Sequence, residues 1–264
     1  MKKIATALTL ALAINIGYSQ DNDDIIIDLN DSKRSKDSKD FKHHRGTFYS
    51  LDFDFGLNNY LQDGKSPDEN NEPYAVIPIG SWYFAINSNH TTHLTGPLYL
   101  QWGGNLSWYN FKFADEAMRI NKQADEVVFE QDPRIADINP IKSKLAATYL
   151  NTSIVPMLDF NDSHCHRYHG NWYKRHHHND SFRIGIGAYA GLKIASHSKF
   201  VYQDEGRKER EKDHDSYYMN NWRYGARLQM GFRDVDIFVN YDMSELFVEN
   251  KGPQLNAFSF GIVI

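Results

Sequence analysis

The sequence predicts an all-β fold: an eight-stranded antiparallel up-and-down transmembrane β-barrel with a short N-terminal periplasmic tail. Three observations predict it. Apolar and polar residues alternate along eight runs, which is the period of a β-strand with two different faces. Long loops and short turns alternate between most of these runs, as in outer-membrane barrels, and a secretory signal precedes them.

The N-terminal segment MKKIATALTLALAINIGYSQ predicts a signal peptide over residues 1–19. Lys2 and Lys3 precede an apolar core, and the small residues Gly17 and Ser19 place the cut before Gln20. An uncleaved anchor is the alternative, but the apolar part is short for a membrane span. Residues 20–45 mix Asp, Lys and Ser and predict a flexible periplasmic leader, and residues 46–264 are predicted to form the barrel.

Four of the predicted strands lie in the first part of this barrel region. TFYSLDFDFGLNNY (47–60) alternates aromatic and leucine side chains with Ser, Asp, Gly and Asn. A less regular run covers roughly residues 80–90, and LYLQWGGNLSWYNF (98–111) alternates again. The fourth run is SKLAATYLNTSIVPMLDF (143–160). Each run predicts a strand with one apolar and one polar face.

The other four strands follow in the same way. FRIGIGAYAGLKIA (182–195) places Phe, Ile and Leu opposite Arg, Gly and Lys. In NWRYGARLQMGFRDVDIFVNY (221–241) the alternation restarts after Arg233 and Asp234, which predicts two strands joined by a tight turn. NAFSFGIVI (256–264) aligns Phe258, Phe260 and Ile262 on one face and predicts the last strand.

The connections between the runs differ in length. Their predicted ranges, in order, are 61–79 (long), 91–96 (short), 114–141 (long), 162–181 (long), 198–216 (long), 233–234 (short) and 248–255 (medium). Apart from the fourth connection they alternate, which is typical of a barrel with long loops outside the cell and short turns in the periplasm.

The volume of the two faces predicts which one lies inside. The interior of an eight-stranded barrel is just wide enough for side chains, and the apolar face carries bulky aromatic residues on strand after strand. We therefore expect the polar face, rich in glycine, to line the interior, and the apolar face to contact lipid. Charges inside need partners; the basic residues expected to pair with acids there are Arg183, Lys193, Arg223 and Arg227, and the acids are Asp52, Asp54, Asp236 and Asp242.

Aromatic residues on the outward face are expected to form the interfacial girdles of a membrane barrel. They are Trp102, Trp108, Trp222, Tyr224 and Tyr241. A soluble exported barrel that binds an apolar ligand is an alternative hypothesis, and it requires the two faces to be reversed.

Composition excludes other classes of protein. The formal net charge of -5 gives no basic field for nucleic acid, and the mean hydropathy of -0.61 excludes a helical membrane bundle. Cys165 is the single cysteine, so an intrachain disulfide is impossible.

Several segments resemble the outer-membrane β-barrel proteins of Bacteroidota, including the PorT-like group. The segments are KSKLAATYLNTSIVPMLDF, FRIGIGAYAGLKI, WRYGARLQMGF and YDMSELFVENKGPQLNAFSFGIVI, within roughly residues 46–264. The resemblance implies an eight-stranded barrel that the outer-membrane barrel insertion machinery handles, and it implies no single activity. Ile264 departs from the aromatic final residue often seen in such barrels.

One predicted connection, DSHCHRYHGNWYKRHHHND (162–180), is rich in potential metal ligands. Imidazole and thiolate together suit zinc, copper or nickel. The candidate metal ligands are His164, Cys165, His166, His169, His176, His177 and His178. The alternative is a polar insertion with solvated histidines, because the ligand spacing follows no fixed motif.

No catalytic motif is visible in the sequence. The glycine-rich GIGAYAG (185–191) lies inside a predicted strand with no helix after it, unlike a phosphate-binding loop. The sequence therefore predicts a non-enzymatic outer-membrane barrel with a structural or surface-interaction role, a lumen closed to solutes and both termini in the periplasm. Its expected partners are outer-membrane lipid, the insertion machinery and a protein bound at the external loops. A periplasmic metal-binding module on a barrel anchor and a lipid-modifying barrel enzyme are the alternatives.

Overall fold

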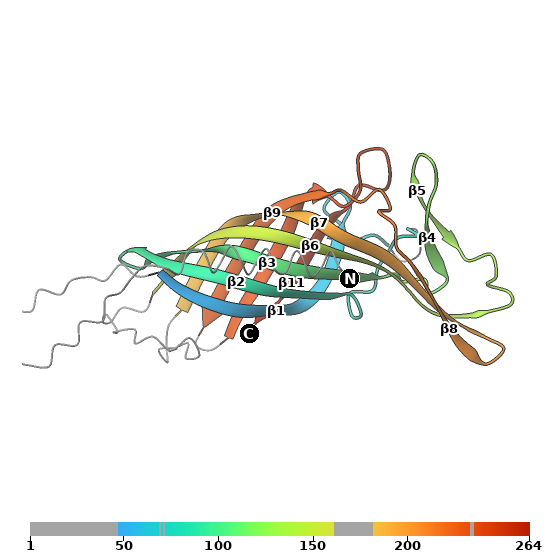
Figure 1. The fold of residues 1–264 in the computed structure, drawn as a ribbon, viewed down its shortest axis with the longest axis horizontal. Helices are drawn as coiled ribbons and strands as arrows, with labels where there is room; N and C mark the ends of the chain where they lie inside the picture. Colours follow the sequence, from blue (N-terminus) through green and yellow to red (C-terminus); the bar gives the residue numbers. More distant parts are fainter. Residues whose placement is uncertain (1–46, 69, 71, 161–181, 233–234) are drawn as a thin grey trace, which may run out of the picture. The chain divides into compact units, whose positions relative to one another are not determined.

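The computed structural model describes residues 47–68, 70, 72–160, 182–232 and 235–264. All regular elements in these ranges are β-strands (Figure 1). Their bounds are β1 (Thr47–Leu61), β2 (Trp82–Thr95), β3 (Leu98–Lys112), β4 (Met118–Lys122), β5 (Val127–Gln131), β6 (Asn139–Asp159), β7 (Phe182–Asp204), β8 (Arg207–Asp213), β9 (Trp222–Phe232), β10 (Val235–Glu245) and β11 (Asn256–Val263). Within the described part of the chain, no helix is long and apolar enough to cross a membrane.

The strands form a closed antiparallel barrel with up-and-down topology. The sheet order is β6-β3-β2-β1-β11-β10-β9-β7-β8, and β6 also pairs with β7, which closes the ring. β8 pairs with β7 beyond the ring, so the barrel itself has eight strands. The pairing of β1 with β11 brings the first and last strands together, for example Leu57 opposite Phe260. The predicted eight-stranded antiparallel barrel is confirmed.

The two ends of the barrel differ. At one end, which we call the turn end, β2 and β3 are joined by the tight Gly96–Pro97 connection, and β11 ends at Val263. At the other end, which we call the loop end, lie the connections 62–81, 113–138 and 246–255 together with β4, β5 and β8 (Figure 1).

Two predicted loops contain strands. The connection predicted over 114–141 holds the β4–β5 hairpin, and the one predicted over 198–216 holds the end of β7 and all of β8. β6 and β7 are consequently 21 and 23 residues long, far more than a membrane span needs. These segments form strands and not loops because backbone hydrogen bonds between β6, β7 and β8 continue past the barrel. Their charged side chains do not prevent strand pairing, because each face is either covered by other residues or hydrated.

The predicted faces are confirmed. Large apolar side chains point away from the interior and are exposed, for example Ile186 (69%), Trp222 (67%) and Leu51 (47%). Of the predicted aromatic residues, Trp102, Trp222, Tyr224 and Tyr241 are exposed and Trp108 is half-buried. The interior holds polar and charged residues, the fully buried Asp54 among them, together with buried aromatic rings such as Tyr109 and Phe238. The soluble exported barrel with an apolar interior is therefore wrong, because the faces have the opposite orientation.

A glycine inside the barrel makes room for a tyrosine ring. A Cβ atom on Gly225 would lie 2.6 Å from the hydroxyl oxygen of Tyr189, whose side chain is buried. The polar face therefore combines small and bulky residues that fill the interior together.

Candidate functional site

Three ion pairs lie in the barrel interior, between arginines and aspartates that the sequence predicts there. They are Arg183–Asp236 (2.6 Å), Arg223–Asp242 (2.6 Å) and Arg227–Asp54 (2.7 Å). Arg227–Asp54 joins β9 to β1, which are far apart in the sequence, whereas Arg223–Asp242 lies between the neighbouring strands β9 and β10. Buried charges of this kind stabilise a fold only when both partners are present and hydrogen-bonded.

The guanidinium group of Arg223 is enclosed by tyrosines. Its central carbon lies 4.5, 4.9 and 4.8 Å from the ring centres of Tyr109, Tyr149 and Tyr189. It donates a hydrogen bond of 2.5 Å to the hydroxyl of Tyr109, and the hydroxyl of Tyr189 donates to Asp242. Cation–π contacts and charge-assisted hydrogen bonds thus hold this side chain in place.

Asp54, the partner of Arg227, is held by several hydrogen bonds. Asp54 accepts hydrogen bonds from Arg227 Nη1 (2.7 Å) and from the amide of Asn87 (2.8 Å). Arg227 Nη1 also lies 3.3 Å from the side-chain oxygen of Asn240. The carboxylate therefore keeps its negative charge compensated although it has no access to solvent.

These contacts leave little free space beside Arg223 and Arg227. The interior cavity beside Arg223 and Arg227 has a volume of about 10 Å³. A single water molecule needs about that much space. This cavity is far smaller than the roughly 300–1,000 Å³ of a typical ligand pocket.

Lys193 differs from the prediction that it pairs with an acid in the interior. Its ammonium group donates to the main-chain oxygens of Met219 (2.6 Å) and Ser216 (3.3 Å). The reason is an irregularity in the β6–β7 pairing next to Lys193, which shifts the alternation of β7. Lys193 therefore fixes a loop-end segment to the barrel.

The interior packing continues into the loops at the loop end. One buried apolar cluster contains barrel residues such as Tyr109 and Phe238 together with loop residues. The loop residues in it include Tyr74, Val76, Phe113, Tyr217, Met219, Phe247 and Leu255. The loops are therefore packed against one another as part of the same core.

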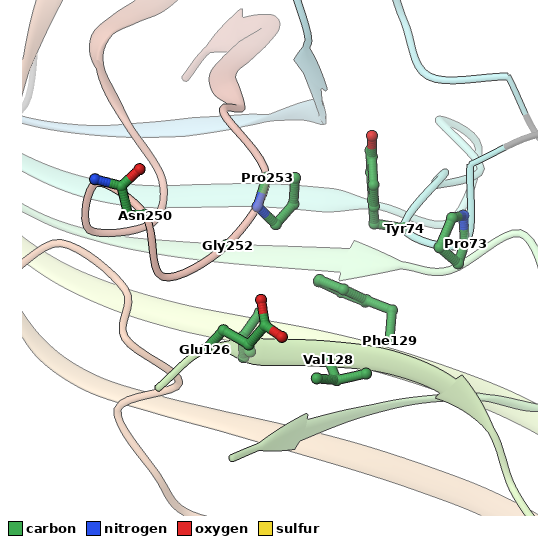
Figure 2. A pocket seen from close by; sticks show the side chains of 9 residues that line it. Pro73, Tyr74, Glu126, Val128, Phe129, Asn250, Gly252 and Pro253 are labelled. Carbon is green, nitrogen blue, oxygen red and sulfur yellow. The ribbon is translucent and has the colours of Figure 1, made fainter. Parts of the chain in front are cut away.

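A groove of about 440 Å³ opens between these loops and strand β5 (Figure 2). Figure 2 shows Tyr74 and Pro253, carried by two different loops, on one side and β5 on the other. The residues that line the groove are Pro73, Tyr74, Glu126, Val127, Val128, Phe129, Asn250, Gly252 and Pro253. We call it the loop-end groove.

The walls of the loop-end groove are held by specific contacts. The ring of Phe129 packs edge-on against Tyr74 (5.6 Å between centres) and Phe247 (6.1 Å). The backbone amide of Val127 donates to the oxygen of Lys251 (2.8 Å), which ties β5 to the 246–255 loop. Burial raises the pKa of Tyr74 to about 12, so its hydroxyl stays protonated and donates to Gln62 (2.5 Å).

Asp132 holds the base of the β4–β5 hairpin. This buried carboxylate accepts hydrogen bonds from Arg119 (2.7 Å) and Arg134 (2.8 Å), and both arginines also contact Glu211 on β8. Hydrogen bonds from Arg134 and then Arg119 hold the pKa of Asp132 well below its ordinary range, against the opposing effect of burial. The hairpin is thereby joined to β8 through charge-assisted contacts.

The contacts of Asp132 predict that the β4–β5 hairpin becomes less stable at acidic pH. Because the pKa of Asp132 is depressed, its contribution is complete above the ordinary carboxylate pKa of about 3.9 and is lost as the pH falls below that value. We expect the β4–β5 hairpin to resist proteolysis at neutral pH and to be cut faster in the Asp132→Asn variant, which loses about 1–2 kcal/mol of local stability. Limited proteolysis at neutral pH measures this, with Glu130→Gln as the control, since Glu130 is exposed on the same hairpin. Equal cleavage of both variants would contradict the role of Asp132.

The seven predicted metal ligands, from His164 to His178, lie outside the described residues. Metal binding by this segment therefore stays a prediction. In the described part of the chain, no group of three or more His, Cys, Asp or Glu side chains is placed to hold a metal ion.

The loop-end groove and the role of Asp132 are not predicted by the alternation of the barrel strands. Two signals point to the strands that form them. MRIN and VVFEQ, on either side of a polar stretch, have the composition of a short hairpin. In RKEREKD, the charge alternates in sign from Lys208 to Asp213, which is the pattern of a strand with one basic and one acidic face.

No protein-family model matches the sequence, and no curated protein matches it. Among solved structures, the chain is similar to the crystal structure of Ail, the attachment invasion locus protein of Yersinia pestis. The identity is 14%, the match covers 83% of this chain and 96% of that chain, and the TM-score is 0.31. Ail in complex with the heparin analogue sucrose octasulfate matches at 13% identity with the same coverage and a TM-score of 0.29.

Proposed function

We propose that the protein is an integral outer-membrane β-barrel with a structural or surface-interaction role and no enzymatic activity, in which the loop-end groove binds the partner. The observation that carries the proposal is the orientation of the two faces. The barrel buries its ion pairs and exposes a belt of large apolar side chains. Such a belt is unfavourable in water and favourable in lipid.

The length of this belt supports a membrane span. On β3 the outward apolar residues extend from Leu98 to Trp108, which matches the roughly 9–11 residues that a tilted strand needs. Aromatic side chains pack side by side on the outer surface, such as Phe84 with Trp108 (5.4 Å) and Phe55 with Trp82 (5.1 Å). We assign these rings to the membrane interface, where girdles of aromatic residues are typical.

The loop-end groove has the chemistry of a binding site for an external partner. Most of its lining residues are aromatic or aliphatic, and Glu126 and Asn250 also line it. Asp125 next to Glu126 is paired with Lys251 (3.5 Å), so Glu126 is the acid that supplies the negative charge here. A peptide or small molecule with an apolar surface and a positively charged group fits this arrangement.

The proposal places both termini in the periplasm and the loop end outside the cell. It follows the resemblance to Bacteroidota barrels, which implies insertion by the outer-membrane machinery. We expect the protein in the outer-membrane fraction, with heat-dependent gel mobility. A tag inserted near Lys65 or Glu209 should be accessible to protease in intact cells, and one near His177 should be protected.

The control for this experiment is the same set of tags in lysed cells, where all three sites should be cut. Protection at Lys65 and Glu209 with exposure at His177 would show that the orientation is inverted. Recovery of the folded protein in the soluble fraction would contradict the membrane location itself.

The histidine-rich segment favours a second function, the binding of zinc, copper or nickel on the periplasmic side. Its composition carries this proposal: six imidazoles and one thiol within residues 164–178. We expect calorimetry to show micromolar or tighter binding that weakens as the pH falls through about 6.5, where histidine becomes protonated. Replacing His164, His166 and His176–His178 with Ala should abolish the binding heat and leave the barrel folded. Equal binding heats for the wild type and the alanine variant would show that these histidines bind no metal and that the segment is a solvated insertion.

A further inference from the structure

Four lysines lie directly opposite one another across four neighbouring strands. Lys112 on β3 pairs with Lys144 on β6, Lys144 pairs with Lys199 on β7, and Lys199 pairs with Lys212 on β8. Directly opposed residues on one face have their Cβ atoms about 4.5–5.5 Å apart. We call this set the lysine row; it continues the outward face of the barrel, since Lys112 has the same parity as Trp108.

The positive charges of the lysine row are only partly neutralised by neighbouring acidic residues. Like charges directly opposite each other destabilise a sheet, and Lys142 adds a further positive charge close enough to repel Lys144. Among the described residues, the row forms one ion pair, Lys112 with Glu116 (3.3 Å), while Lys144 donates to the side-chain oxygen of Asn110 (2.6 Å). The face therefore carries an excess of positive charge that the protein itself does not neutralise.

The acidic residues of β8 face the other way. Glu211 contacts Arg134 and Arg119, and Asp213 accepts a hydrogen bond from Tyr217 (3.0 Å). Lys208 and Arg210 share the parity of Lys212 and extend the basic face. The two faces of the projecting sheet are thus separated by charge, with the acidic face used for packing inside the loop end.

The position of the row relative to the apolar belt indicates what it meets. Trp108 pairs with Thr148, which pairs with Ala195, and the lysine row lies four residues further along each of β3, β6 and β7. Four residues of a tilted strand rise roughly 10 Å. If Trp108 marks the membrane interface, this height is that of the lipid headgroups, and lysine stems bridge such distances readily.

We propose that the lysine row binds the phosphate groups of anionic lipid headgroups in the leaflet around the loop end. The inference rests on the proposed membrane location of the barrel. Charge complementarity and continuity with the lipid-facing belt favour lipid over a soluble polyanion. Bound phosphates relieve the repulsion between opposed ammonium groups, and each lysine near an anionic surface adds a favourable contribution.

The test compares the protein with the K144Q/K199Q/K212Q variant in nanodiscs of phosphatidylcholine that contain a minor fraction of phosphatidylglycerol. Titration with phosphatidylglycerol, followed by native mass spectrometry, counts the bound anionic lipids. We expect the variant to lose at least about tenfold in apparent affinity for phosphatidylglycerol. The K65Q/K122Q/K251Q variant removes the same charge from the loops and should keep the affinity.

A second readout separates loss of binding from misfolding. In vesicles of phosphatidylcholine alone, the K144Q/K199Q/K212Q variant should be at least as resistant to urea as the wild type, because the opposed charges are gone. In vesicles with phosphatidylglycerol, the wild type should be the more resistant of the two.

Equal phosphatidylglycerol affinity in the wild type and the K144Q/K199Q/K212Q variant would overturn the inference. So would binding of soluble polyphosphate to the row without any preference for phosphatidylglycerol. Both outcomes leave a folded, inserted barrel. Failure to insert into nanodiscs, seen as loss of heat-dependent gel mobility, would instead contradict the proposed membrane location.

Discussion

Replacing Arg227 with leucine is expected to lower the free energy of unfolding of the barrel by about 3–5 kcal/mol. The change leaves Asp54, which has no exposed surface, without its ion-pair partner at 2.7 Å. The hydrogen bond from Asn87 to Asp54 remains, but it does not compensate the charge. Urea titration of the protein in lipid vesicles measures the effect.

The matched control is the double variant Asp54→Leu/Arg227→Leu. Removing both charges avoids a buried unpaired carboxylate, so the double variant should be more stable than Arg227→Leu. If Arg227→Leu unfolds at the wild-type urea concentration, the ion pair between β1 and β9 contributes nothing, and the charged interior would not be the element that joins these strands.

Replacing Leu228 with arginine is expected to lower the free energy of unfolding by about 2–4 kcal/mol in lipid. Leu228 lies on the outward face of β9, opposite Val239 on β10 and Ile186 on β7, in the middle of the apolar belt. An arginine there places a charge near the centre of the hydrocarbon layer. Urea titration in vesicles is again the measurement.

Met243→Arg is the control for this change. Met243 is exposed on the same outward face, four residues from Val239 toward the loop end. At that height the cost should fall to about 0–1 kcal/mol, because arginine reaches the interface. Equal losses of stability at the two positions would show that the cost of a charge does not depend on its depth in a membrane. The assignment of this face to lipid would then be wrong.

The candidate site was less predictable than the barrel. The period-two alternation of β1, β3, β9 and β10 determines which side chains face the interior and which face outward. A one-residue shift in register would turn every side chain to the opposite face. The loop-end groove depends on Phe129 meeting Tyr74 and Phe247, and these residues come from three separate segments. No local pattern indicates that they meet.

Lys193 shows a related limit. Its place in the alternation of β7 predicts a side chain in the interior, but an irregularity in the pairing directs it to the carbonyl oxygens of Ser216 and Met219. A bulge is a property of two paired strands, so the sequence of one strand does not reveal it.

The sequence by itself determined the barrel: eight two-faced strands, an apolar exterior, and an interior that contains the charges of Arg183, Arg223 and Arg227 together with aspartates. These features follow from short-range alternation and from the rule that buried charges need partners. Only the tertiary structure decided which strands extend beyond the barrel, how the loops pack into the loop-end groove, and that Lys112, Lys144, Lys199 and Lys212 form one row. The physical reason is that register between strands and contacts between loops join residues distant in the chain, and their energies depend on the partner as much as on the residue itself.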